Sequence, residues 1–130
     1  MKHNRFFVLV FFVFLALVPS FAAQPQKTVK ILAIGNSFSV DAVEQNLYEL
    51  AQSDGINLII GNMYIGGCSI ERHVKNLRGN IPDYEYRKIV DGTRTNTKNF
   101  TLEKALADEQ WDYVGSQHGV RHSGKLDSLA

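Results

Sequence analysis

Two apolar runs with an amphipathic stretch between them constrain the fold of this chain most strongly. The first run is residues 29–35, VKILAIG, and the second is residues 56–65, INLIIGNMYI. Both are short, rich in apolar residues and bounded by glycine or polar residues. This pattern is typical of strands that are buried on both faces of a parallel sheet.

Between these runs, apolar residues recur with the spacing of a helix. The residues on this stripe are Val40, Val43, Leu47, Leu50 and Ala51. Asp41 and Glu44 come early in the stretch, where carboxylates favour a helix N-terminus, and Gly55 is placed as the residue that follows a helix end. Strand, helix and strand in this order predict a right-handed βαβ unit.

The rest of the chain predicts a short helix, a hairpin, a second helix and a third core strand. Ser69 would cap the short helix, and Thr101 would cap a helix that ends near residue 109. Asp91 and Gly92 lie between two alternating runs, as in a β-hairpin. WDYVGSQ, residues 111–117, would form the third strand, with Trp111 and Tyr113 as packing residues. We therefore predict an α/β fold with three parallel strands and an inserted β-hairpin, whose Arg87, Lys88 and Arg94 would form a solvated surface.

The first 23 residues predict a secretory signal peptide. Lys2, His3 and Arg5 form a basic start, residues 6–18 are a continuous apolar run, and small residues that fit a cleavage site follow. The apolar run is shorter than the ~20 residues of a membrane span, although an N-terminal anchor helix is the alternative. We expect a secreted or periplasmic protein whose domain, residues 24–130, has no stable membrane span after cleavage.

Charge and cysteine content exclude several classes of function. A formal net charge of +1 predicts neither nucleic acid nor an anionic membrane as a partner. A single cysteine, Cys68, cannot form an internal disulfide, and a small buried thiol is its expected state, with pairing between two chains as the alternative. His118 and His122 follow the third strand without a firm carboxylate partner, so we predict no metal and no cofactor. His73 is expected to be solvated on the short helix.

Ser37 follows the first predicted strand, in the stretch ILAIGNSFS. Ligands of open parallel α/β sheets bind beyond the carboxyl ends of the strands, and Gly35 lets the chain turn sharply at that point. The hydroxyl of Ser37 would suit a nucleophile with nearby N–H donors for an oxyanion. Alternatively, Ser37 or Ser39 serves only as a helix cap. Neither phosphate-loop spacing nor a GxSxG elbow occurs in the sequence, which makes nucleotide or phosphate binding a minor alternative.

Two motifs carry a resemblance to a known superfamily. ILAIGNSFS resembles the first block of the SGNH hydrolases, in which Gly-Asp/Asn-Ser follows the first strand. IGGCSIE, residues 65–71, is similar to the Gly-Gly-Thr/Ser-x-Ile-Glu segment of the sialate O-acetylesterase-like branch. Together with TLEKAL and WDYV, these motifs look most like a group of secreted bacterial SGNH-like proteins. The resemblance implies a three-layer α/β/α, flavodoxin-like sheet and a serine esterase, with a small-molecule or carbohydrate ester such as an O-acetyl sugar as substrate.

The resemblance also implies the roles of individual residues. Ser37 would be the nucleophile, and its own N–H would form the oxyanion hole with that of Gly66 or Gly67. Gln117 is the candidate for a third donor, through its side-chain amide. This last position departs from the superfamily, where an Asn in a Gly-x-Asn-Asp block supplies that donor.

The base of the superfamily is missing from the sequence. In SGNH enzymes a late Asp-x-x-His block provides it, whereas Asp127 is followed here by Ala130 in the place of the histidine. SGNH domains need roughly 200 residues, a size common for single domains, so the resemblance implies a C-terminally truncated and incomplete domain. The alternative to an esterase is a non-catalytic remnant or a carbohydrate-binding module of the same fold. An uncovered sheet edge would make the isolated chain poorly soluble or marginally stable.

Overall fold

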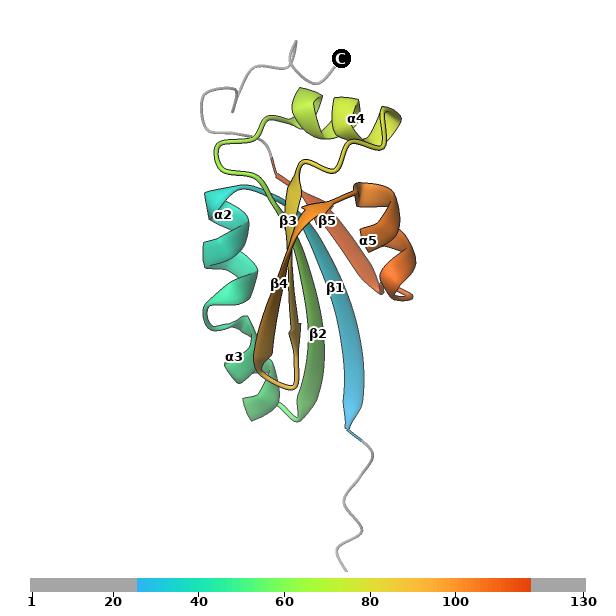
Figure 1. The fold of residues 1–130 in the computed structure, drawn as a ribbon. Coiled ribbons are helices and arrows are strands. Elements are labelled where there is room, and N and C mark those ends of the chain that lie inside the picture. The colour runs from blue at the N-terminus through green and yellow to red at the C-terminus, as the bar shows by residue number, and fades with distance from the viewer. Residues whose placement is uncertain (1–25, 118–130) are drawn as a thin grey trace, which may run out of the picture.

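The computed structural model describes residues 26–117, which form a five-stranded sheet in the order β4-β3-β2-β1-β5 (Figure 1). The strands are β1 (Lys27–Gly35), β2 (Ile56–Tyr64), β3 (Tyr84–Val90), β4 (Thr93–Phe100) and β5 (Tyr113–Ser116). β1 is parallel to both β2 and β5, whereas β3 is antiparallel to β2 and to β4. The predicted α/β class, the three parallel strands and the hairpin are confirmed. The predicted signal peptide, His118, His122 and Asp127 lie outside the described residues.

The helical segments within residues 26–117 are α2 (Ser37–Ser39), the π-helical η1 (Val40–Glu44), α3 (Leu47–Ser53), α4 (Ile70–Arg78) and α5 (Leu102–Asp108). The single regular helix predicted over the stripe is therefore wrong. Wider π-helical turns interrupt it, and Glu44 at the end of η1 turns its carboxylate into the protein, where 2% of the side chain is exposed. Such turns occur frequently at functional sites. None of the helices in this part of the chain is long and apolar enough to cross a membrane.

α3 and η1 cover one face of the sheet (Figure 1). Leu58 and Ile60 of β2 and Ile89 of β3 form the buried centre of this face. The predicted stripe residues Val43, Leu47 and Ala51 pack against it. Leu50 does not, because it faces solvent with 62% of its surface exposed.

α5 covers the opposite face, and α4 lies beyond one end of the sheet (Figure 1). Leu32, Met63, Tyr86, Leu102 and Ala105 belong to the core on this side. Trp111 has the predicted packing role: its Nε1 donates to the carbonyl oxygen of Ala105 over 2.8 Å. A Cβ atom on Gly61 would lie 2.8 Å from the Trp111 ring, so only glycine fits beneath the indole.

β5 forms one edge of the described sheet. All four of its residues are exposed, including Tyr113 at 65% and Val114 at 52%. The predictions of a core strand and of a packing role for Tyr113 are therefore wrong. The reason is that β5 pairs with β1 on one side only, and nothing else among residues 26–117 pairs with its outer side.

The predicted helix caps and the predicted hairpin turn are confirmed. Ser69 accepts a hydrogen bond from the amide of Arg72, and Thr101 accepts one from Lys104, as N-caps do. Asp91 and Gly92 both have positive φ angles, which is the conformation of a two-residue type I′ hairpin turn.

Candidate functional site

The turns that follow β1 and β2 lie side by side; we call residues 35–39 the serine turn and residues 65–69 the glycine turn. The amide of Ile65 donates to the carbonyl oxygen of Gly35 over 3.1 Å. The side-chain amide of Asn36 donates to the carbonyl oxygen of Cys68 over 3.2 Å. Both contacts join the two turns directly, so Ser37 and the paired glycines share one edge of the sheet.

Ser37 has an exposed side chain that caps no helix. The N-cap of α2 is Asn36, whose Oδ1 accepts a hydrogen bond from the amide of Phe38 over 3.1 Å. Ser39 is buried, and its hydroxyl lies 2.7 Å from the carbonyl oxygen of Asn36 and 2.9 Å from Oδ1 of Asn62. The capping alternative therefore fails for both serines. Within residues 26–117 the hydroxyl of Ser37 makes no hydrogen bond.

The serine turn and the glycine turn both carry backbone donors without a partner. The amides of Ser37, Gly66 and Gly67 have no hydrogen-bond partner in the described part of the chain, and all three residues are exposed. Gly67 has a φ of +62°, a conformation that residues with a side chain rarely adopt. A Cβ atom at Gly67 would meet no atom within 4 Å, so the space above the glycine turn is open.

Gln117 follows β5 and reaches the same edge. Its backbone amide donates to the carbonyl oxygen of Ile34 over 3.0 Å. Its side-chain oxygen lies 3.2 Å from the position that a Cβ atom of Gly35 would occupy. That oxygen is buried without a partner among the described residues. The three segments that carry the predicted site residues thus end at one edge of the sheet.

His73, the one histidine among residues 26–117, does not contact Ser37. It is 5% exposed, its Nδ1 lies 2.8 Å from the hydroxyl of Tyr84, and its ring stacks on that tyrosine. Burial and the nearby charge of Arg72 lower the pKa of His73. The prediction that His73 is solvated is therefore wrong, because the face of α4 that carries it packs over the start of β3. The described residues contain no cluster of three or more His, Cys, Asp or Glu side chains that could hold a metal ion.

Cys68 is a buried free thiol, as predicted. Its sulfur lies 3.6 Å from Nδ1 of His73. Burial is the main cause that raises the pKa of the thiol. This environment disfavours the thiolate, so Cys68 is a packing residue rather than a second nucleophile.

A buried polar network supports the serine turn. Oε1 of Glu44 accepts from the side-chain amide of Asn62 over 2.5 Å, and Oε2 lies 3.0 Å from Arg94 and 3.4 Å from Arg87. Asn62 in turn contacts Ser39. The network therefore connects the serine turn to the β3–β4 hairpin. In the sequence, the feature that could have indicated this network is Asn62, a polar residue inside a strand predicted to be buried on both faces.

A family model described as "Domain of unknown function (DUF4886)" matches residues 30–130. This chain belongs to the DUF4886 family. It is similar to the crystal structure of a DUF4886 family protein from Bacteroides uniformis ATCC 8492, with 60% sequence identity and a TM-score of 0.76. The match covers 78% of this chain and 40% of that chain, so this DUF4886 chain spans less than half the length of that relative. No curated protein matches the chain.

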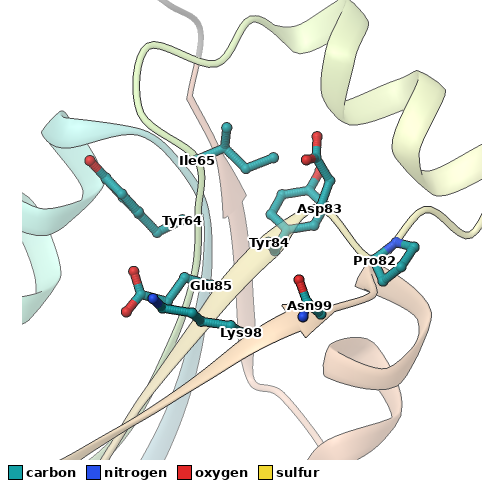
Figure 2. Close-up of a pocket in the computed structure, with 8 residues that line it drawn as sticks. All are labelled: Tyr64, Ile65, Pro82, Asp83, Tyr84, Glu85, Lys98 and Asn99. Carbon is teal, nitrogen blue, oxygen red and sulfur yellow. The ribbon is translucent and has the colours of Figure 1, made fainter.

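The DUF4886 fold also has a pocket of about 280 Å³ beside the glycine turn (Figure 2). Its lining residues are Tyr64, Ile65, Pro82, Asp83, Tyr84, Glu85, Lys98 and Asn99. Sequence reasoning missed this pocket because its walls come from three segments that are distant in the chain.

The hairpin beside this pocket is solvated only in part, because the Asp91–Gly92 turn, Arg94 and most of β4 are exposed as predicted but Arg87 and Lys88 are not. Arg87 and Lys88 have side chains that are 16% and 21% exposed, and both form ion pairs. The guanidinium of Arg87 lies 3.9 Å from the centre of the Tyr64 ring and 3.0 Å from the carboxylate of Glu85. Pairing of β3 with β2 brings these cations over the sheet, which sequence spacing alone does not reveal.

Proposed function

We propose that the DUF4886 fold is an SGNH-type serine ester hydrolase in which Ser37 is the nucleophile. The observation that carries the proposal is that Asn36, Ser37 and Ser39 make different contacts in the serine turn. Asn36 caps the helix and Ser39 is buried in the polar network, which leaves the hydroxyl of Ser37 free at the carboxyl edge of three parallel strands. Ligands of open α/β sheets bind at this edge. The proposal includes the three-layer α/β/α, flavodoxin-like arrangement of that superfamily.

In the proposed reaction, the oxygen of Ser37 attacks the carbonyl carbon of an ester, and its proton passes to a base. The alcohol leaves, and water then hydrolyses the acyl-serine. The N–H groups of Ser37 and of Gly66 or Gly67, with the side-chain amide of Gln117, would stabilise the oxyanion. The unpaired amides of Ser37, Gly66 and Gly67 support this assignment. An ester of a small molecule or carbohydrate, such as an O-acetyl sugar, is the proposed substrate.

The proton of Ser37 needs a base, and residues 26–117 do not supply one, since His73 is bonded to Tyr84. This observation favours a second candidate function, a non-catalytic module that binds carbohydrate with the same fold. We expect the chain to show little esterase activity unless an external base is supplied. Export through the signal peptide of residues 1–23 remains part of the proposal, and N-terminal sequencing of the exported protein would test it.

Chemical rescue tests the role of Ser37 directly. The chain is incubated with p-nitrophenyl acetate and increasing imidazole, which serves as an external base, and acetylation is located by peptide mass spectrometry. We expect imidazole-dependent acetylation at Ser37, release of p-nitrophenol above that of Ser37→Ala, and unchanged behaviour of the exposed control Ser53→Ala. Equal release from the wild type and Ser37→Ala, with no acetyl group at residue 37, would refute the nucleophile assignment.

A further inference from the structure

The pocket beside the glycine turn has the size of a site for one small ring. Its volume of about 280 Å³ lies near the lower end of the range of about 300–1,000 Å³ for small-molecule sites. Figure 2 shows Tyr64 at the end of β2 with Ile65 directly after it, and Asp83 directly before β3 with Glu85 near the start of that strand. Lys98 comes from β4. The hairpin therefore builds a wall that the parallel strands alone would lack.

The pocket borders the proposed oxyanion site. Tyr64 and Ile65 directly precede Gly66 in the chain. A Cβ atom on Gly66 would lie 3.3 Å from the hydroxyl of Tyr64. A ligand in the pocket would thus lie next to the glycine turn.

Two ionised carboxylates are fixed in the pocket wall. Oδ2 of Asp83 lies 2.7 Å from the guanidinium of Arg72, and this hydrogen bond is the main cause that lowers the pKa of Asp83. Glu85 pairs with Arg87 over 3.0 Å, which likewise lowers the pKa of Glu85. Hydrogen bonds to ionised acceptors are stronger than those between neutral groups, so both side chains are good acceptors for hydroxyl groups.

Lys98 and Asn99 add a cationic donor and a side-chain amide to the pocket lining. The side chains of Lys98 and Asn99 make no hydrogen bond or ion pair within residues 26–117, and the charge of Lys98 also lowers the pKa of Glu85. Each wall carboxylate has its own guanidinium, so a cationic ligand finds no carboxylate without an ion-pair partner, whereas an anionic ligand could pair with Lys98 only beside the carboxylates of Asp83 and Glu85. Ile65 and Pro82 add apolar surface between the polar groups.

We propose that this pocket binds one neutral sugar ring, whose hydroxyl groups donate to Asp83 and Glu85 and accept from Lys98 and Asn99. A polyhydroxylated ring satisfies acceptors and donors together, which an apolar or singly charged ligand does not. Binding of the sugar does not depend on ester hydrolysis. Only its position as the substrate subsite rests on the proposed function.

Saturation-transfer NMR on the Ser37→Ala chain tests the pocket apart from any ester chemistry. The probes are the methyl glycosides of glucose, galactose, mannose and xylose, with glucuronate and glucosamine as charged comparators. We expect at least one neutral glycoside to bind, and binding to weaken about tenfold when Asp83→Asn or Glu85→Gln is added, since each removes a hydrogen bond to a charged group. Glu49→Gln, an exposed carboxylate on α3, is the matched control and should leave binding unchanged.

Three results would overturn the proposal: no neutral glycoside binds, neither carboxamide variant weakens binding, or a charged comparator binds more tightly than every neutral probe. Amide spectra of each variant establish that it is folded, and Lys98→Gln provides a further variant outside the Arg72 and Arg87 ion pairs. Sugar binding without acetylation of Ser37 would refute the proposed hydrolase but support the proposed sugar site. Acetylation of Ser37 without sugar binding would support the proposed hydrolase and refute the proposed sugar site.

Discussion

The side-chain amide of Asn36 donates a hydrogen bond to the carbonyl oxygen of Cys68 over 3.2 Å, and both residues are almost completely buried. The same side chain accepts from the amide of Phe38 at the start of α2. Asn36 therefore holds the serine turn against the glycine turn, together with the backbone bond from Ile65 to Gly35. The separation between the proposed nucleophile and the proposed oxyanion donors depends on this contact.

Replacement of Asn36 by alanine should lower the free energy of unfolding by about 2–3 kcal/mol. The variant leaves the buried carbonyl of Cys68 without a donor and removes the helix cap. Urea unfolding followed by circular dichroism measures the change. Asn46→Ala is the control, because Asn46 is an exposed N-cap residue without a side-chain capping bond, and it should cost less than about 0.5 kcal/mol. Equal losses in the two variants would show that the contact with Cys68 contributes nothing.

Gly35 is the position where the serine turn tolerates no side chain. A Cβ atom there would lie 2.8 Å from Cβ of Ser39 and 3.2 Å from the side-chain oxygen of Gln117. We expect Gly35→Ala to destabilise the fold by about 1–3 kcal/mol, as overpacking does. Gly115→Ala in β5 should be close to neutral, because no atom lies within 4 Å of its Cβ position. Thermal unfolding of both variants checks this, and a Gly35→Ala protein as stable as Gly115→Ala would contradict the packing of the turn.

Features with a local signal could be predicted from the sequence. The runs that became β1 and β2, the caps at Ser69 and Thr101, and the turn at Asp91 all depend on neighbours in the chain. The meeting of Ser37 with the glycine turn could also be expected, because parallel strands end at one edge.

Features that depend on distant contacts could not be predicted. Asn36 gains its role from Cys68, and His73 is buried because Tyr84 of β3 packs against it. Glu44 faces inward because two arginines of the hairpin meet its carboxylate. Each pair is separated by enough sequence that neither periodicity nor composition indicates it.

Glu44→Gln should destabilise the fold far more than Arg94→Gln, although the two residues form one ion pair. The side chain of Glu44 is 2% exposed, whereas that of Arg94 is 51% exposed. Loss of the carboxylate leaves the guanidinium of Arg87, whose side chain is 16% exposed, with Glu85 as its remaining ion-pair partner, at a cost of about 3 kcal/mol. Loss of the exposed arginine should cost less than about 1 kcal/mol. Urea unfolding of the two variants measures both values, and equal effects would mean that the network does not support the serine turn.

Protonation of His73 should destabilise the folded state as the pH falls below 6.5. Burial is the main cause that lowers the pKa of His73 from its ordinary value of 6.5, and the charge of Arg72 adds to it. The unfolded chain therefore takes up a proton at a higher pH than the folded chain. Stability from the neutral ring is complete above pH 6.5 and is lost as the pH falls toward the folded pKa, by at most about 1.4 kcal/mol per pH unit. Asp83 and Glu85 stay ionised in this window, because their pKa values are lowered from 3.8 and 4.5.

The test combines urea unfolding across this pH range with an NMR titration of the His73 ring. His73→Gln is the comparison variant, and it should show a smaller fall in stability between pH 6.5 and about one unit below it. The ring of His73 should titrate below 6.5 in the folded protein, since the ring is 5% exposed and lies near the charge of Arg72. A folded-state pKa at or above 6.5, or identical pH profiles for the wild type and His73→Gln, would show that the buried ring does not couple protonation to unfolding.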